Sequence, residues 1–186
     1  GGGLPFYHPD FIVDKVHHVL KNGGNPDFFN YPGLVLYIHA FFYLIFHFIE
    51  KYCAIFIPFF IFAPDYFLIS HLVTLTFSVT GSILVYLSSY ILFKRRLFAF
   101  LSGLILSTSL IWVAHSHYIT VDLPLAVLCA FTLFLSLKYI KSSGSLTWSR
   151  LALAGGGVGL CASAKYNGGL IIFSLLLPLI YCQRKK

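Results

Sequence analysis

Three charged residues stand out in this chain because each lies beside or within an apolar run. They are Asp10 near the N-terminus, Asp122 before a long apolar segment, and Lys165 in the middle of one. A carboxylate can take a proton from a hydroxyl group, or it can ligate a metal ion. A lysine inside an apolar segment is costly, so it indicates a site for a ligand or an ion. Its compact positive charge suits a phosphate group.

Each of the three residues also has a simpler structural explanation. An aspartate in the first turn of a helix satisfies free N–H groups and favours the helix dipole, which would account for Asp10. Asp122 precedes Leu123-Pro124 and would serve as an N-cap. Lys165 could snorkel to the membrane interface from a helix end. For the aspartates both explanations stay open, whereas for Lys165 we favour an anionic ligand.

The sequence around Asp122 is richer in polar groups than a helix cap requires. His115 and His117 precede it in the stretch HSHYITVD. Two histidines separated by one residue fall on different faces of a helix, so the pair is a weak indication of a metal site. A divalent metal ion held by Asp10 and Asp122 is nevertheless the one cofactor that these residues suggest.

The composition indicates an integral membrane protein. The chain is 58% hydrophobic and 10% charged, whereas soluble domains carry about 25% charged residues. Its net charge of +7 comes from short basic clusters between apolar runs, which does not indicate nucleic-acid binding. The chain has no methionine and begins in what reads as a loop, so we expect a fragment that lacks its natural N-terminus.

The apolar runs predict an all-α polytopic helix bundle. Residues 1–32 should form an outer loop with an amphipathic helix on the membrane surface, its apolar face made by Ile12, Val16 and Val19. Glu50-Lys51 divides the next apolar region, 33–63, into interfacial or re-entrant helices. The transmembrane bundle should occupy 66–186, with spans at 66–93, 97–114 and 123–140 and a hairpin at 151–182.

The basic clusters predict the direction of each span. They lie at 94–96, 138–150 and 184–186, and basic loops favour the cytoplasmic side. The segment 151–182 must then cross outward and return. Each arm of this hairpin would be about 20 Å long at 1.5 Å per residue, which is short of a membrane core of about 30 Å. Its tip should therefore lie near the outer interface.

This topology places three polar stretches on one outer face, and their convergence is the functional clue. The stretches are HPD at 8–10, HSHYITVD at 115–122 and AKYN at 164–167. The candidate site residues are Asp10, His117, Asp122, Lys165, Tyr166 and Asn167.

The order of the motifs resembles a family of membrane enzymes. HPDFIVDK, NGGNPDFFNYPGLVLYI, HSHYITVDLPLAVL and GVGLCASAKYNGGLIIF follow one another along the chain. They resemble the GT-C glycosyltransferases of the dolichyl-phosphate-mannose-protein mannosyltransferase-like group, which also contains the aminoarabinose lipid A transferase. The resemblance covers nearly the whole chain, which would be the N-terminal part of a longer enzyme and incomplete for activity by itself.

The resemblance implies transfer of a sugar, with inversion, from a polyprenyl- or dolichyl-phosphate carrier to a protein, lipid or glycan acceptor. It implies an active face on the outer side of a bacterial or archaeal plasma membrane, or on the luminal side of the ER membrane. Asp10 matches the acidic residue that serves as base for the acceptor, and Asp122 matches a second family aspartate. Lys165 matches a lysine near the lipid phosphate. Phe11 replaces the second acid of the usual Asp-Glu pair.

Two other classes of protein are alternatives to an enzyme. A transporter or channel fragment would use the same charges as a substrate pathway, but such charges should lie deep within the bilayer rather than near one interface. A non-catalytic membrane subunit is the second alternative. Under every interpretation the expected partners include membrane lipids. The residues do not identify the sugar or the acceptor.

Overall fold

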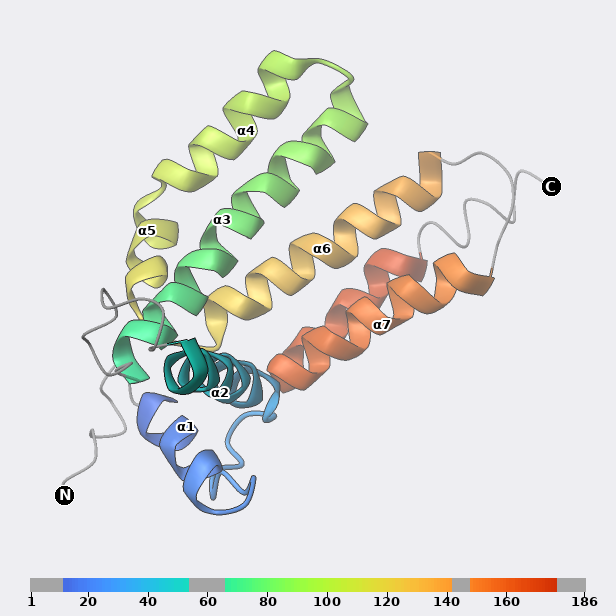
Figure 1. The fold of residues 1–186 in the computed structure, drawn as a ribbon. Coiled ribbons are helices and arrows are strands. Elements are labelled where there is room, and N and C mark those ends of the chain that lie inside the picture. The colour runs from blue at the N-terminus through green and yellow to red at the C-terminus, as the bar shows by residue number, and fades with distance from the viewer. Residues whose placement is uncertain (1–11, 54–65, 142–147, 177–186) are drawn as a thin grey trace.

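The computed structural model describes residues 12–53, 66–141 and 148–176, and these residues form an all-helical structure (Figure 1). The all-α fold class predicted from the sequence is therefore confirmed. The helices are α1 (Ile12–Lys21), α2 (Leu34–Cys53), α3 (Tyr66–Phe93), α4 (Arg96–Thr108), α5 (Leu110–His117), α6 (Asp122–Lys141), α7 (Trp148–Ala164) and the 3₁₀ helix η1 (Tyr166–Ile172).

Two of these helices, α3 and α6, are long and apolar enough to cross a membrane. The pair α4 and α5 makes a third candidate span if it is counted as one segment, although it bends by 57°. The apolar helices at Leu151–Ala164 and Tyr166–Leu176 are shorter. The membrane-helix class is thus confirmed for the described residues.

The span predicted at 97–114 is divided into two helices, α4 and α5, which together remain one candidate span. The chain leaves the helical conformation at Ser109, whose backbone angles of φ −68° and ψ 135° are extended. The Ser109 hydroxyl accepts a hydrogen bond from the backbone N–H of Trp112 at 3.3 Å, and so caps the start of α5. Serine and threonine side chains compete with the helix backbone in this way. Because α5 then continues to His117, part of the expected polar break is helical.

The ends of the bundle differ in charge. The α3–α4 connection carries Lys94 and Arg95, and α6 ends with Lys138 and Lys141 in its last turn. These basic residues lie at the end of the bundle away from α1 and α2, whereas α6 begins and α7 ends beside α2 (Figure 1). Helices α3 and α6 therefore both end at the basic end of the bundle. The direction in which each span crosses the membrane stays a prediction.

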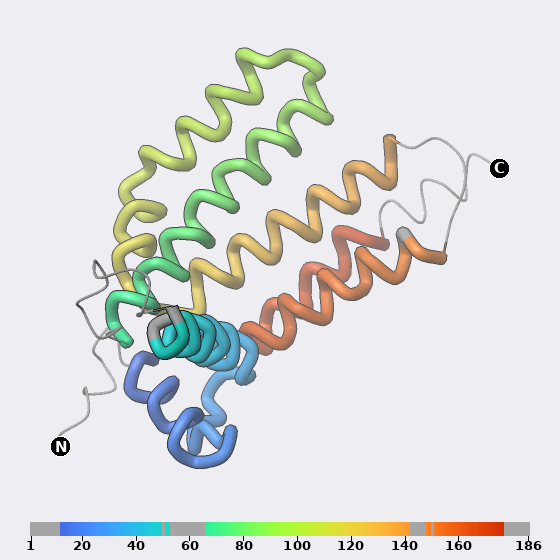
Figure 2. Tube along the Cα trace, in the orientation of Figure 1, coloured from blue at the N-terminus to red at the C-terminus, as the bar shows by residue number. Residues whose placement is uncertain are grey.

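Helices α1 and α2 cover the other end of the bundle. In Figure 2 the axis of α2 points nearly toward the viewer, while α3, α6 and α7 run across the view. Helix α2 continues through Glu50-Lys51 to Cys53, so the expected break at that dipeptide is wrong. Its outer side exposes large apolar residues, among them Phe41, Phe48 and Tyr52.

The apolar face of α1 packs on protein. The location of α1 at the membrane surface stays a prediction. Ile12, Val16 and Val19 form this face as expected, and all are buried. They belong to one core cluster that joins α1 to α2, to the loop before α6 and to the end of α7. Its other members include Val35, Leu36, Ile119, Val121 and Ala164.

The last two helices reverse direction at Lys165. Lys165 is in the extended conformation (φ −154°, ψ 137°), and its backbone N–H donates to the Cys161 carbonyl at 3.1 Å. The N–H of Gly168 donates to the Lys165 carbonyl at 2.8 Å and closes the turn. Small residues allow α7 to approach α6 closely, since the sulfur atoms of Cys129 and Cys161 are 3.8 Å apart.

Replacement of Gly168 by alanine should loosen this turn. Gly168 is buried, and a methyl group there would collide with the backbone carbonyl of Cys161 and lie 2.6 Å from a methyl group of Leu125. We expect Gly168→Ala to lower the free energy of unfolding by about 1–3 kcal/mol, the usual cost of overpacking. Thermal unfolding of the purified protein in detergent measures this change.

Gly169→Ala is the matched control. A methyl group at Gly169 would meet only the Ala162 side chain, at an ordinary distance of 3.5 Å. Equal melting temperatures for the two variants would contradict the tight turn described here.

Candidate functional site

The charged pair that the sequence analysis brought to one face is in direct contact. The Nζ atom of Lys165 donates a hydrogen bond to Oδ1 of Asp122 at 2.7 Å. Asp122 is the first residue of α6, and Lys165 stands in the turn between α7 and η1. The contact therefore joins two segments that are 43 residues apart in the sequence.

The backbone on either side of this pair is held by the core under α1. Val121 precedes Asp122 and is 4% exposed, and Ala164 precedes Lys165 and is completely buried. Both belong to the core cluster that contains the apolar face of α1. Packing of α1 against these two residues thus sets the separation of the charged side chains that follow them.

The pair itself remains open to solvent. The Lys165 side chain is 27% exposed and that of Asp122 is 47% exposed. The hydrogen bond to Asp122 raises the pKa of Lys165, and partial burial acts in the opposite direction. Lys165 lies outside the candidate membrane spans and carries an ammonium group at neutral pH.

Residues of the connector between α1 and α2 contact the turn at Lys165. The Nζ atom of Lys165 lies 5.5 Å from the centre of the Tyr31 ring, within the range of a cation–π contact. The Tyr166 hydroxyl donates to the backbone carbonyl of Phe29 at 3.2 Å. Two residues of the connector therefore fix the position of the turn relative to α1.

A small cavity adjoins the ion pair on the side of α5. Its volume is about 210 Å³, and α5 and α6 line it with Ile111, Trp112, His115, Asp122, Leu123 and Ala126. Most of this lining is apolar, so the Asp122 carboxylate stands at the edge of a largely hydrophobic space. The Nδ1 atom of His115 is buried, and no described residue makes a hydrogen bond to it.

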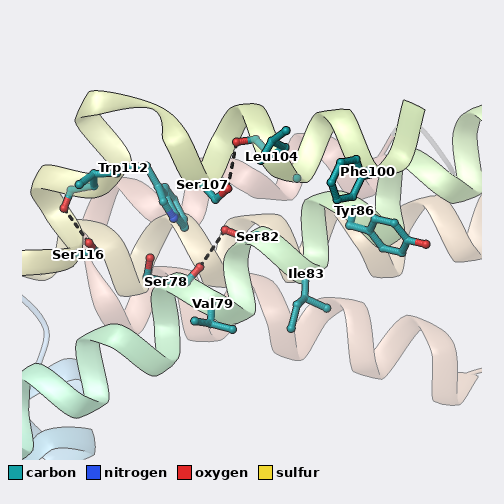
Figure 3. A pocket seen from close by; sticks show the side chains of 12 residues that line it. Ser78, Val79, Ser82, Ile83, Tyr86, Phe100, Leu104, Ser107, Trp112 and Ser116 are labelled. Atoms are coloured by element: carbon teal, nitrogen blue, oxygen red, sulfur yellow. Dashed lines mark hydrogen bonds between the residues drawn. The ribbon is translucent and has the colours of Figure 1, made fainter. Parts of the chain in front are cut away.

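A larger cavity of about 390 Å³ lies farther along the bundle, between α3 and the α4–α5 segment (Figure 3). Ser78 and Ser82 of α3 face Ser107 and Trp112 across it. The serine hydroxyl groups do not make this larger cavity the candidate site, because neither Asp122 nor Lys165 lines it. The smaller cavity is the one that shares a wall with the charged pair.

The other predicted site residues have different outcomes. Tyr166 contributes its hydroxyl to the turn, as described above. His117 is the last residue of α5 and is exposed, and Asn167 follows Tyr166 and is also exposed. Asp10 lies outside the described residues, so its place beside Asp122 and Lys165 stays a prediction.

Two contributors to the site were not singled out from the sequence. Tyr31 belongs to the Tyr-Pro-Gly step before α2, and this aromatic-proline step was the one signal for it. The sequence indicated His115 only as part of the polar stretch before Asp122 and as half of a weak metal-binding pair with His117. The break at Ser109 is what makes α5 a separate helix that lines a cavity with Asp122.

The geometry of the described residues does not build a metal site. No group of three His, Cys, Asp or Glu side chains in residues 12–53, 66–141 and 148–176 is arranged to hold an ion. The Asp122 carboxylate instead accepts from an ammonium group. A metal bound by Asp10 and Asp122 stays a prediction that depends on a residue outside this part.

Comparison with known proteins identifies one family. The family model described as dolichyl-phosphate-mannose-protein mannosyltransferase matches residues 57–183, which is more than half of the chain. The match includes Asp122 and Lys165 and excludes Asp10. No curated protein and no solved structure matches the chain.

Loss of the ion pair should change stability only slightly, because both side chains are partly exposed. Exposed pairs contribute about 0.2–1 kcal/mol. We therefore expect Asp122→Asn to lower the free energy of unfolding by no more than about 1 kcal/mol, measured by thermal unfolding in detergent. A loss several times larger would mean that the pair holds the turn together by itself.

Proposed function

Because the chain belongs to the dolichyl-phosphate-mannose-protein mannosyltransferase family, we propose that Lys165 binds the phosphate of its lipid-linked sugar donor. The family is one of membrane glycosyltransferases, and membership suggests a dolichyl-phosphate-mannose-dependent protein mannosyltransferase. The observation that carries the proposal is the ammonium group of Lys165, partly exposed at the turn of an apolar hairpin and held there by Asp122.

The position of Lys165 suits an amphiphilic donor. The lipid tail must stay among apolar surfaces, while the phosphate needs a cation close to water. Arms shorter than a full membrane span put the turn between these two environments. Lys165 would neutralise the bound phosphate, and it would stabilise the charge that grows on the phosphate as the bond to the sugar breaks.

The transfer itself needs one base. The acceptor oxygen attacks the anomeric carbon of mannose while the bond from that carbon to the phosphate oxygen breaks, which inverts the configuration. The proton of the acceptor hydroxyl passes to a carboxylate, for which we propose Asp10 on the basis of the family resemblance. The lipid phosphate leaves as an anion without needing a proton. Asp122 would hold Lys165 in place before the donor binds, and Tyr31 would orient it during this step.

We propose that this reaction takes place on the outer or luminal face of the membrane. Four basic residues, Lys94, Arg95, Lys138 and Lys141, lie at the end of the bundle opposite to the start of α6 and the end of α7 (Figure 1). Basic loops favour the cytoplasmic side, so the ion pair would face outward.

Removal of the Lys165 charge should affect transfer more than folding. We expect Lys165→Ala in the full-length protein to lower kcat/KM for mannose transfer from dolichyl-phosphate mannose by about 10- to 100-fold, the range for loss of a charged hydrogen bond. Radiolabelled mannose transferred to an acceptor protein measures this rate. Asp10→Asn should also abolish most transfer, because an amide cannot accept the proton.

Lys141→Ala is the matched control, since Lys141 is an exposed lysine at the opposite end of α6. It should transfer mannose at nearly the normal rate. Normal activity in Lys165→Ala would rule out the phosphate-binding role.

The orientation can be tested with single cysteines at Tyr118, Tyr166 and Lys141, in a protein without its four native cysteines. Tyr118 is 44% exposed and Tyr166 is 67% exposed. A membrane-impermeant maleimide added from the outer or luminal side should label positions 118 and 166 and spare position 141. Labelling of position 141 instead would reverse the proposed orientation.

A further inference from the structure

The second half of α2 exposes large apolar side chains on more than one face of the helix. In the first half, Val35 and Leu36 are buried in the core. A helix that is apolar on every side does not rest in water. An apolar surface of this extent indicates contact with a membrane or with another protein. The exposed residues of the second half are Phe41, Phe42, Leu44, Ile45, Phe48, Ile49 and Tyr52.

The place of α2 in the fold favours a membrane as that contact. Helices α3 and α6 are candidate membrane spans, and α2 lies across their direction at one end of the bundle (Figure 2). Helix α1 packs against α2 and lies farther from the centre of the spans (Figure 1). It exposes the polar side chains of His18 and Lys21. Helix α2 therefore lies between the apolar spans and a polar layer, which is where a membrane meets water.

The residues at the C-terminal end of α2 also suit a membrane interface. The Nζ atom of Lys51 lies 5.7 Å from the centre of the Tyr52 ring. Tyrosine is enriched at the boundary between lipid and water, and lysine reaches from that boundary toward water. The neighbouring charges of Glu50 and Lys51 would be costly deeper in the hydrocarbon core. These features favour a helix in the plane of the membrane over one that enters it.

The start of α3 extends the apolar surface of α2. Helix α3 packs against α2, and Leu68 and Leu72 in its first two turns are exposed. Because α3 is a candidate span, a membrane would cover these leucines. The exposed surface of α2 thus adjoins a lipid-facing surface, and lipid is the partner that fits both.

The buried side of α2 is connected to the charged pair through the core. Val35 of α2 belongs to the same core cluster as Val121 and Ala164, the residues that precede Asp122 and Lys165. Helix α2 also packs against α7. The backbone at Lys165 therefore keeps a fixed position relative to α2, so the depth of α2 in a membrane determines the depth of the ammonium group.

We propose that residues 41–53 lie in the plane of the membrane interface, with lipid against their exposed side chains, and that this contact holds Lys165 at the level of the lipid phosphates. The apolar face of an interfacial helix enters the boundary between head groups and acyl chains by about 5–10 Å. Lys165 then stands among the head groups, where the phosphate of a lipid-linked sugar also lies. This second step rests on the proposed function, whereas the location of α2 does not.

The location is tested by crosslinking in the full-length protein, reconstituted in vesicles of phosphatidylcholine. A benzophenone analogue of phenylalanine replaces Phe48, which is 62% exposed. After irradiation, mass spectrometry identifies what has reacted with it. Because benzophenone reacts with C–H bonds beside it, we expect a phosphatidylcholine adduct at position 48. An adduct with another protein segment instead would overturn the location.

Two further positions calibrate the crosslinking yield. Phe100 is 58% exposed on α4, part of the bent candidate span, and the same analogue there should also give a lipid adduct. His18 is exposed on α1, and the analogue there should give little. Lipid adducts at position 100 but not at position 48, or equal yields at positions 18 and 48, would contradict an interfacial α2.

The effect on donor depth is tested by removing the apolar contact. We expect Phe41→Ser combined with Phe48→Ser to raise the KM for dolichyl-phosphate mannose in vesicles by about three- to tenfold. The kcat at saturating donor should change by less than about twofold. A vesicle holds the donor phosphate in one plane, whereas a detergent micelle does not. In detergent, the KM of this variant should therefore equal that of the wild type.

Phe100→Ser is the matched control, because it removes the same side chain with similar exposure from a different helix. It should keep the wild-type KM in vesicles and in detergent. An unchanged KM of the α2 variant in vesicles, or an equal rise in detergent, would show that α2 does not set the depth of the site.

Lys165→Ala separates this inference from the proposed function. It should lower transfer in vesicles and in detergent alike, because the donor carries the same phosphate in both. Normal transfer by Lys165→Ala would contradict the proposed function and leave the expected lipid adduct at position 48 unaffected. Reduced transfer by Lys165→Ala with an unchanged KM in the α2 variant would contradict the role of α2 alone.

Discussion

The ammonium group of Lys165 is the constraint on which the architecture of this site depends. A charge within an apolar hairpin is stable only where it meets water or an opposite charge. The chain satisfies both conditions by reversing direction at Lys165, so that the ammonium group leaves the apolar helices at their end and contacts Asp122 at 2.7 Å. The turn of the hairpin and the start of α6 must therefore lie at the same level of the bundle.

The packing of α1 and α2 against this end of the bundle sets that level. The residues immediately before the two charged positions, Val121 and Ala164, are buried in the core that α1 completes. Tyr31 and the carbonyl of Phe29 then contact Lys165 and Tyr166 from the connector. Apolar packing thus positions the backbone, and the polar contacts adjust only the side chains. This division explains why a partly exposed ion pair can keep one geometry.

The sequence was sufficient for the parts of the structure that follow from hydropathy and charge. The apolar run at 66–93 and the basic clusters were enough to bring Asp122 and Lys165 to one end, because each span reverses the direction of the chain. The apolar face of α1 was also predicted, but its partner was not, since periodicity shows that a face is buried without showing what covers it. The break at Ser109 was missed because serine is tolerated within helices, and only its local hydrogen bond decides between continuation and capping.

Partial exposure of the ion pair would allow it to take part in the proposed donor binding. Separation of two fully buried charges leaves each without a partner and costs several kcal/mol, which an arriving ligand would first have to supply. A pair in which Asp122 is 47% exposed can exchange partners at a cost of about 1 kcal/mol or less. Under the proposed function, the weak contact with Asp122 would direct Lys165 to one position and still let it exchange the carboxylate for a phosphate. An apolar scaffold with a weak ionic contact at its end would then serve an amphiphilic donor better than a deeply buried salt bridge.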